Sequence, residues 1–217
     1  LVGLGAVMVE RTGTRLGEDI PGDEAAGDRG IPFATGALTL CPGGFIPRCP
    51  GQPVYQAFTA DFTAASTTAV AIPNITGGTT GVSQSVTVAG NPDDCLVIDV
   101  DVTLNITHSW MDELDVSMAH GGITSVLFDD ICSSNSGYQQ ILDDDAATNV
   151  TACTSLTGAP TTRRKSESGG ALDGFNGSPA NGAWTLTVLD DVQTGNGTGT
   201  LTSWGITGQC RYKRLVP

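Results

Sequence analysis

Two short runs of alternating side chains constrain the fold more than any other feature of this sequence. They are 183–190 (AWTLTVLD) and 199–207 (GTLTSWGIT), and each places bulky residues at about every second position. A period of two is that of a half-buried β-strand. Turn-forming Asn, Gly and Asp residues lie between the runs, and another dense turn signal, 176–182, precedes them. The pattern predicts a β-hairpin with one tryptophan on each arm, Trp184 and Trp204.

Further runs of the same kind predict more strands. They are 54–62, 85–89, 96–107, 114–119, 123–128 and 139–142. The clearest is 96–107, which is expected to turn one face to a core, with Leu96, Ile98, Val100, Val102, Leu104 and Ile106 on that face and Val97 on the other. Residues 63–68 and 159–170 are predicted loops, the second holding the basic residues Arg163–Lys165. No helical period stands out, so we expect an all-β antiparallel β-sandwich or jelly-roll barrel.

The first 53 residues differ in composition and predict an extended N-terminal arm. Residues 10–53 are rich in Gly, Pro and charge and hold too little apolar surface for a core. Residues 1–9 are apolar, too short for a membrane anchor and without the basic flank of a signal peptide, so they are expected to form one strand. Its apolar side chains are Leu1, Val2, Leu4, Val7 and Val9. The expected organisation is an arm (1–53), a sandwich (54–210) and a short tail (211–217).

The cysteine content indicates an oxidising compartment. The six cysteines are Cys41, Cys49, Cys95, Cys132, Cys153 and Cys210. None forms a CxxC pair and there are only two histidines, which argues against a zinc site and for disulfides in an oxidising, extracellular environment. Six cysteines allow fifteen pairings. The proximity of expected strand ends favours Cys41–Cys49, Cys95–Cys210 and Cys132–Cys153.

A net charge of −13 makes nucleic acid an unsuitable partner.

Several separated motifs resemble the P domain of kexin- and furin-like proprotein convertases and of secreted bacterial subtilisin-like proteases. The residues that carry the resemblance are Leu172, Phe175 and Gly177, then 181–188 with Asp190, then Gly199, Leu201, Trp204 and Ile206, and upstream 72–74, 102–114, 127–129 and 142–146. The resemblance covers roughly 70–208. One departure is Asp112-Glu113, where the family has Gly-Asp. The resemblance implies a β-rich module that follows a catalytic domain and performs no catalysis itself.

Acidic side chains are the main candidates for a binding site. They cluster at Glu113 with Asp115, at Asp129 with Asp130, and at 143–145. Ca²⁺ binds six to eight oxygens, often from adjacent loops. The resemblance implies calcium near Glu113, Asp129 and Asp144 or Asp145; the alternative is a solvated acidic edge that aids solubility. Asp190 and Asp191 are expected to form a turn.

Catalysis is not expected from this sequence. The two histidines are His108 and His120, and no nucleophile elbow or subtilase serine motif accompanies them. We expect a structural hydrogen bond from His108 and a turn position for His120, which precedes two glycines.

Of five Asn-x-Ser/Thr sequons, Asn74, Asn149 and Asn196 lie in expected loops and are the better candidates for glycosylation.

Two functions therefore remain. The first is a structural extracellular subunit that assembles with copies of itself, since an apolar strand such as 1–9 can be donated to a neighbour's open sheet, and contacts that do not close build filaments. The second is an accessory domain of a secreted protease. Because a Gly/Pro-rich arm rather than a catalytic domain precedes the module in this sequence, the first is favoured. A carbohydrate-binding module is a weaker third possibility, since no exposed aromatic row is evident.

Overall fold

The computed structural model describes residues 40–41, 44–45, 54–74, 80–153, 156–158, 161–192 and 197–216. The chain divides into two units, Leu1–Val54 with Leu215–Pro217, and Tyr55–Arg214. In the first unit, β1 (Leu40–Cys41) pairs antiparallel with β2 (Gly44–Phe45). The predicted assembly strand, with Leu1, Val2, Leu4, Val7 and Val9, and the cysteine Cys49 lie outside the described residues, so both predictions concerning them stay predictions.

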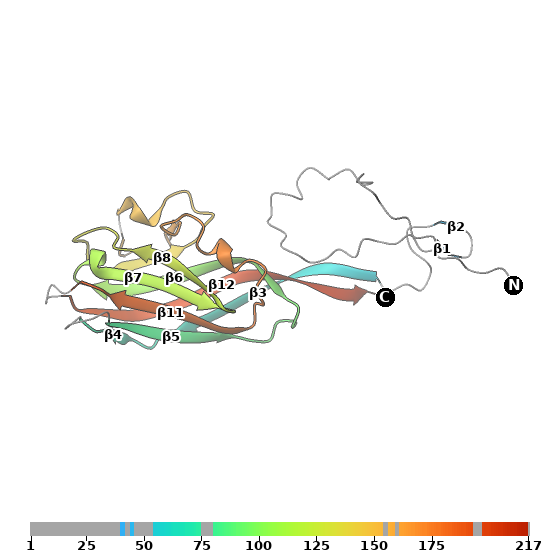
Figure 1. Ribbon diagram of the computed structural model, residues 1–217, viewed down its shortest axis with the longest axis horizontal. Coiled ribbons are helices and arrows are strands. Elements are labelled where there is room, and N and C mark those ends of the chain that lie inside the picture. Colours follow the sequence, from blue (N-terminus) through green and yellow to red (C-terminus); the bar gives the residue numbers. More distant parts are fainter. Residues whose placement is uncertain are drawn as a thin grey trace. The chain divides into compact units, whose positions relative to one another are not determined.

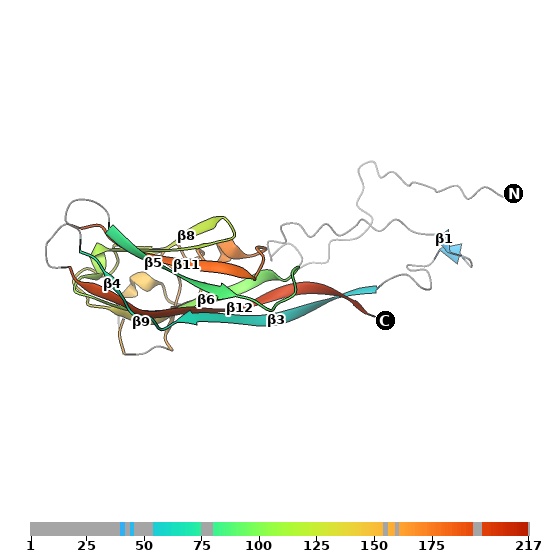
Figure 2. The same ribbon diagram turned by 90° about the horizontal axis from the view of Figure 1, so that it is seen from below.

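The second unit consists of two β-sheets packed face to face (Figures 1 and 2). The larger sheet has the order β10 (Arg163–Arg164), β9 (Tyr138–Leu142), β6 (Leu96–His108), β12 (Gly199–Val216) and β3 (Val54–Ser66), with β4 (Val70–Ile72) also paired to β12. The smaller sheet has the order β5 (Thr80–Val88), β11 (Gly182–Asp190), β7 (Leu114–His120) and β8 (Ile123–Asp129). Short 3₁₀ helices are η1 (Met111–Glu113), η2 (Val150–Ala152) and η3 (Asp173–Phe175). The predicted sandwich is confirmed, and within the described residues the sheets do not join into a closed barrel.

The predicted hairpin is wrong, although both of its strands exist. β11 pairs with β5 and β7 in the smaller sheet, whereas β12 pairs with β6 in the larger one. The two strands therefore belong to opposite layers of the sandwich. Alternation shows only that a strand has one buried face, and two strands that face each other across a core satisfy it as well as two that pair.

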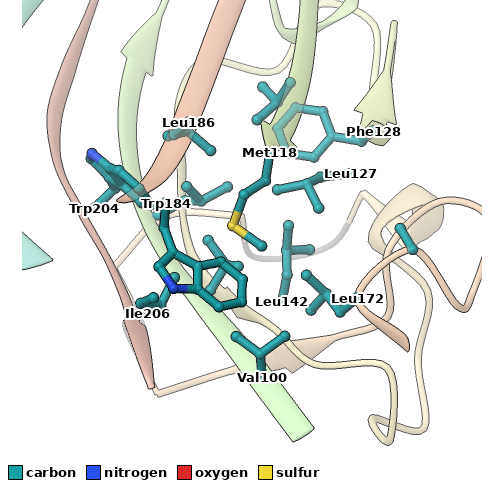
Figure 3. Close-up of a cluster of buried hydrophobic side chains, with 14 of the residues drawn as sticks. Val100, Met118, Leu127, Phe128, Leu142, Leu172, Trp184, Leu186, Trp204 and Ile206 are labelled. Atoms are coloured by element: carbon teal, nitrogen blue, oxygen red, sulfur yellow. The ribbon is translucent and has the colours of Figure 1, made fainter. Parts of the chain in front are cut away.

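Trp184 and Trp204 consequently contribute to the core from opposite sheets (Figure 3). Trp184 is fully buried, and its ring stacks on Phe62 of the larger sheet with a centroid separation of 6.0 Å. Met118, Phe128 and several aliphatic side chains fill the remaining space. Burial of each large apolar side chain contributes about 1.5–3 kcal/mol, so this cluster holds the two layers together.

Two β-bulges interrupt the alternation of buried and exposed residues that the sequence predicts. One step along β12, from Gln209 to Cys210, corresponds to two steps along β6, from Asp99 to Val97, so Ile98 is the additional residue. A bulge reverses the phase of a strand; Val97 is therefore buried, contrary to the prediction, while Leu96 and Ile98 are only half-buried. The predicted core face from Val100 to Ile106 is confirmed.

A second bulge at Thr202 lets Leu201 and Trp204 of β12 both face the core, although three positions separate them. Three other boundaries differ from the prediction. β3 continues through part of the expected loop to Ser66, β10 lies within the expected loop 159–170 and runs parallel to β9, and β12 continues to Val216 through the expected tail.

Two of the three predicted disulfides are confirmed. Cys95–Cys210 connects the start of β6 to β12 across 115 residues, and Cys132–Cys153 connects the segment after β8 to the end of η2. The helices in the described part of the chain are all too short and too polar to cross a membrane.

Candidate functional site

A buried cluster of three titratable side chains lies where three elements of the sandwich meet. His108 ends β6, Glu113 ends η1 and Asp190 ends β11. The exposed fractions are 4% for His108, 4% for Glu113 and 0% for Asp190, and each side chain has a ligand-type atom within 4.8 Å of the others. We call this group the buried cluster. Burial raises the pKa of Asp190, whereas the neighbouring His108 lowers it.

The hydrogen bonds of His108 define how its ring is oriented. Nδ1 lies 2.6 Å from the carbonyl oxygen of Trp110, and the Trp110 N–H points at the same nitrogen, with 3.2 Å between the two nitrogen atoms. The shorter contact requires a proton on Nδ1, because two lone pairs would repel at that distance. Nε2 then faces the cluster, 3.5 Å from Asp190 Oδ2. The prediction of a structural hydrogen bond from His108 is confirmed.

Two glycines, Gly197 just before β12 and Gly199 at its start, lie against the buried cluster. A Cβ atom on Gly197 would collide with the Glu113 carboxylate and lie 3.0 Å from Asp190 Oδ2. A Cβ atom on Gly199 would collide with the imidazole of His108. Only glycine can therefore bring the backbone so close to these three side chains.

A second group, the surface cluster, consists of Asp115, Asp129 and Asp130. Asp115 on β7 lies directly opposite Asp129, the last residue of β8, and Asp130 follows in a left-handed conformation with φ 50°. The three carboxylates also come within 4.8 Å of one another, but Asp129 and Asp130 are exposed. Burial, followed by its contact with Asp129, raises the pKa of Asp115 to about 7. Asp129 and Asp130 follow the strand predicted at 123–128, and the register of β7 against β8 explains why they meet Asp115.

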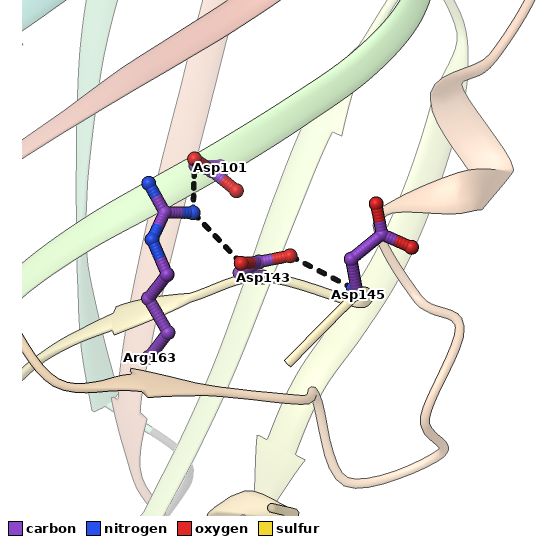
Figure 4. Close-up of polar contacts among 4 residues, drawn as sticks. All are labelled: Asp101, Asp143, Asp145 and Arg163. Carbon is purple, nitrogen blue, oxygen red and sulfur yellow. Dashed lines mark hydrogen bonds and ion pairs between the residues drawn. The ribbon is translucent and has the colours of Figure 1, made fainter. Parts of the chain in front are cut away.

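A third group, the arginine cluster, is fully paired (Figure 4). Nη1 of Arg163 on β10 donates to Asp101 Oδ2 at 2.6 Å and to Asp143 Oδ2 at 2.7 Å. Asp143 Oδ1 accepts a hydrogen bond from the Asp145 backbone N–H at 2.8 Å. Arg163 therefore belongs to a short strand that neutralises acidic residues, and not to the solvated loop that the sequence predicts.

Asp144, between these residues, anchors the backbone. Its carboxylate accepts hydrogen bonds from Ser166 Oγ at 2.7 Å, from the Leu172 N–H at 2.7 Å and from the Asp173 N–H at 3.1 Å. The four predicted calcium ligands thus occupy different environments, and within the described residues they form no common cluster. Glu113 is in the buried cluster, Asp129 is in the surface cluster, Asp144 binds backbone groups and Asp145 is exposed.

Asp190 has a role that the sequence prediction does not give it. The expected turn position is wrong, because Asp190 is the last residue of β11 and is completely buried. A signal was present: Asp190 continues the two-residue spacing of Trp184, Leu186 and Val188, all of which face the core. An acidic residue in phase with a buried face needs a charged or polar partner.

His120 is part of the core packing. It ends β7 instead of lying in the predicted turn, and its ring stacks on Trp184 with a centroid separation of 3.7 Å. Its ring nitrogens contact the carbonyl oxygens of Ala183 and Pro179. The hydrogen bonds that Nδ1 of His108 and both ring nitrogens of His120 form are therefore to backbone groups.

The glycosylation candidates occupy three different situations. Asn74 is half-buried, and Asn196 lies outside the described residues. Asn149 caps η2, and its Nδ2, the atom that would carry a glycan, donates to the carbonyl oxygens of Ser166 and Glu167 at 2.9 Å each. A glycan at Asn149 would therefore have to displace two hydrogen bonds.

Comparison with known proteins gives one family and two structural neighbours. The model of the proprotein convertase P-domain family matches residues 97–208. A search of curated proteins yields no match. Among solved structures, the chain is similar to the serine protease of Aeromonas sobria (14% identity, TM-score 0.38, 73% of this chain and 28% of that chain). It is also similar to that organism's serine protease in complex with the chaperone ORF2 (16% identity, TM-score 0.35, 73% of this chain and 27% of that chain). The chain spans just over a quarter of the length of either neighbour.

Proposed function

The chain belongs to the proprotein convertase P-domain family, and from this premise we propose that it is a non-catalytic accessory module of a secreted subtilisin-like protease. The observation that carries the proposal is the family match across 97–208, which includes the central strands of both sheets. The two disulfides suit a protein of an oxidising compartment, and therefore secretion. Both ring nitrogens of His120 and Nδ1 of His108 contact backbone groups, an arrangement that suits a structural role.

The proposed task of the module is to stabilise a catalytic domain. A rigid two-layer sandwich with a disulfide between β6 and β12 can present a fixed surface to a partner without reorganising itself. The gain for the partner is a lower population of its unfolded state, since a ligand that binds only the folded form shifts the equilibrium toward it.

The test uses the complete chain and a subtilisin-like catalytic domain encoded by the same genome. We expect that the chain alone hydrolyses no casein, and that joining it to the catalytic domain lengthens the half-life of the protease at elevated temperature. An unrelated β-sandwich joined through the same linker serves as the control. Peptidase activity of the isolated chain, or a half-life equal to that of the control fusion, would contradict the proposal.

Self-assembly through residues 1–9 is the other candidate from the sequence analysis. That segment lies outside the described residues, and no observation within them favours a filament. Light scattering of the complete chain at increasing concentration distinguishes the two candidates, because an accessory module remains a single species whereas a filament subunit grows in mass.

Calcium is retained as a proposal for the surface cluster only. Asp115, Asp129 and Asp130 supply hard oxygen ligands at close range, and burial, followed by contact with Asp129 and repulsion from nearby carboxylates, raises the pKa of Asp115. A bound Ca²⁺ would offset that repulsion and fix the end of β8 against β7.

A further inference from the structure

The geometry of the buried cluster points to a structural zinc site, and we propose that His108 Nε2 and the carboxylates of Glu113 and Asp190 bind one Zn²⁺ ion. This inference goes beyond the accessory function proposed above and does not depend on it.

The first argument is the state of the His108 ring. With its Nδ1 proton donated to the Trp110 carbonyl oxygen at 2.6 Å, the ring turns Nε2 inward. A metal-binding histidine usually has this arrangement, in which a backbone carbonyl orients the ring and leaves the other nitrogen as the ligand. The backbone around Trp110 therefore pre-organises His108 as a ligand.

The second argument is a distance. His108 Nε2 and Asp190 Oδ2 are 3.5 Å apart, and neither atom has a hydrogen-bond partner among the described residues. A direct N–H···O bond requires about 2.7–3.2 Å. Two ligands that bind one tetrahedral zinc ion at about 2.1 Å each are separated by about 3.4 Å. The observed separation therefore matches two ligands of a common ion better than it matches a hydrogen bond.

The third argument is charge. Two carboxylates and an imidazole are enclosed together, and the side chains of His108 and Asp190 are 0% exposed. With one proton on each ring nitrogen the group would carry a net charge of −1, and burying such a charge is costly. A Zn²⁺ ion with neutral His108 and two carboxylates gives a net charge of zero. Nitrogen together with oxygen ligands suits Zn²⁺ better than Ca²⁺, which binds oxygen.

The site explains why zinc was not expected from the sequence. The three ligands come from the ends of β6, η1 and β11, so they follow no short motif with fixed spacing. Gly197 and Gly199 bring the backbone close over the ligands and exclude bulk solvent. Such a closed site is typical of structural zinc, so the ion is expected to exchange slowly in the folded protein.

The experiment measures zinc in the complete chain. The protein is unfolded in a chelator with its disulfides intact, freed of chelator, and refolded with or without ZnCl₂. Elemental analysis after dialysis should find about one zinc per chain, with a higher Tm than in the zinc-free sample. Zinc-edge X-ray absorption should show one imidazole nitrogen with oxygen ligands at about 2.0–2.2 Å.

Two isosteric variants and one control test the assignment. Asp190→Asn and Glu113→Gln keep the shape of the cluster but weaken binding, by more than about tenfold, and both should abolish the zinc-dependent rise in Tm. Both variants should fold without zinc, because each removes one buried negative charge. Asp129→Asn in the surface cluster should retain full zinc binding.

Three results would overturn the proposal. One is the absence of retained zinc in the refolded wild-type chain. Another is loss of zinc from Asp129→Asn with retention in Asp190→Asn, which would place the ion in the surface cluster. The third is a spectrum without imidazole nitrogen, which would exclude His108 as a ligand.

Discussion

The arginine cluster and the surface cluster contain similar acidic side chains but balance their charge in opposite ways. In the arginine cluster, Arg163 lies between Asp101 and Asp143 and donates to both. In the surface cluster, Asp115 faces Asp129 directly, and the pKa of Asp115 rises to about 7. Where the chain supplies its own cation, the carboxylates connect β10 to β6 and to the residue that follows β9, and where it does not, burial and the facing carboxylate favour a proton on Asp115.

The largest effect is expected from removing the carboxylate of Asp144, whose hydrogen-bond donors all come from this chain. Asp144→Ala should destabilise the protein by about 3 kcal/mol, because several backbone and hydroxyl donors lose a charged acceptor at once. Urea unfolding of both proteins measures the change in the free energy of unfolding. An effect below about 0.5 kcal/mol, the level of an ordinary surface substitution, would show that Asp144 does not anchor this region.

Replacing Arg163 should leave the carboxylates of the arginine cluster without a positively charged partner, as in the surface cluster. Arg163→Met leaves Asp101 and Asp143 without their common partner and should cost about 1–2 kcal/mol, since Arg163 is 48% exposed and solvent screens part of the interaction. The double variant Arg163→Met with Asp101→Asn should recover much of the loss in urea unfolding. A double variant as unstable as the single one would mean that packing of the arginine stem, and not charge, dominates.

The surface cluster should make the protein less stable as the pH rises toward neutrality. The raised pKa of Asp115 means that the folded protein binds more protons than the unfolded chain between pH 3.8 and about 7. Stability in chelated buffer should therefore fall as the pH rises through this window. Asp115→Asn should remove that fall and raise stability at pH 7 by less than about 1 kcal/mol. Urea unfolding at a series of pH values decides, and identical profiles for both proteins would contradict the expectation.

Calcium should produce the smallest effect, confined to the same cluster. We expect Ca²⁺ to raise the Tm of the wild-type chain at pH 7 by a few degrees, because it replaces the missing cation. The rise should shrink in Asp129→Asn and be unchanged in Arg163→Met, which serves as the matched control. Equal rises in the two variants would place any calcium elsewhere in the molecule.

Alternation along the strands was sufficient to predict the sandwich but not the layer of each strand. Val100–Ile106 of β6 was assigned to the core correctly because the period of two is a local property. The assignment of β11 and β12 to one hairpin failed because layer membership depends on partners far away in sequence. Val97 was misplaced because the bulge at Ile98 arises from the pairing with β12, which no pattern within β6 reveals.

The candidate sites were predictable to a similar extent. Asp129 and Asp130 were recognised as acidic residues at a strand end, and the two confirmed disulfides were chosen from expected strand ends. The grouping of Glu113 with His108 and Asp190 required the ends of three separate elements to be placed in space. The role of Arg163 was missed because β10 has only two residues and pairs parallel to β9, which leaves no alternation to detect.

The position of β12 has a consequence for how the chain is made. β12 follows every other strand of the sandwich in the described residues, yet it lies between β6 and β3 in the larger sheet, and it also carries the second cysteine of the disulfide whose partners are 115 residues apart. A polypeptide is synthesised from its N-terminus, so β3 has no neighbour in the larger sheet and Cys95 has no bonding partner until the residues of β12 have been made. The sandwich is thus compelled to mature late, and its folding is delayed until nearly all of its strands are available for pairing.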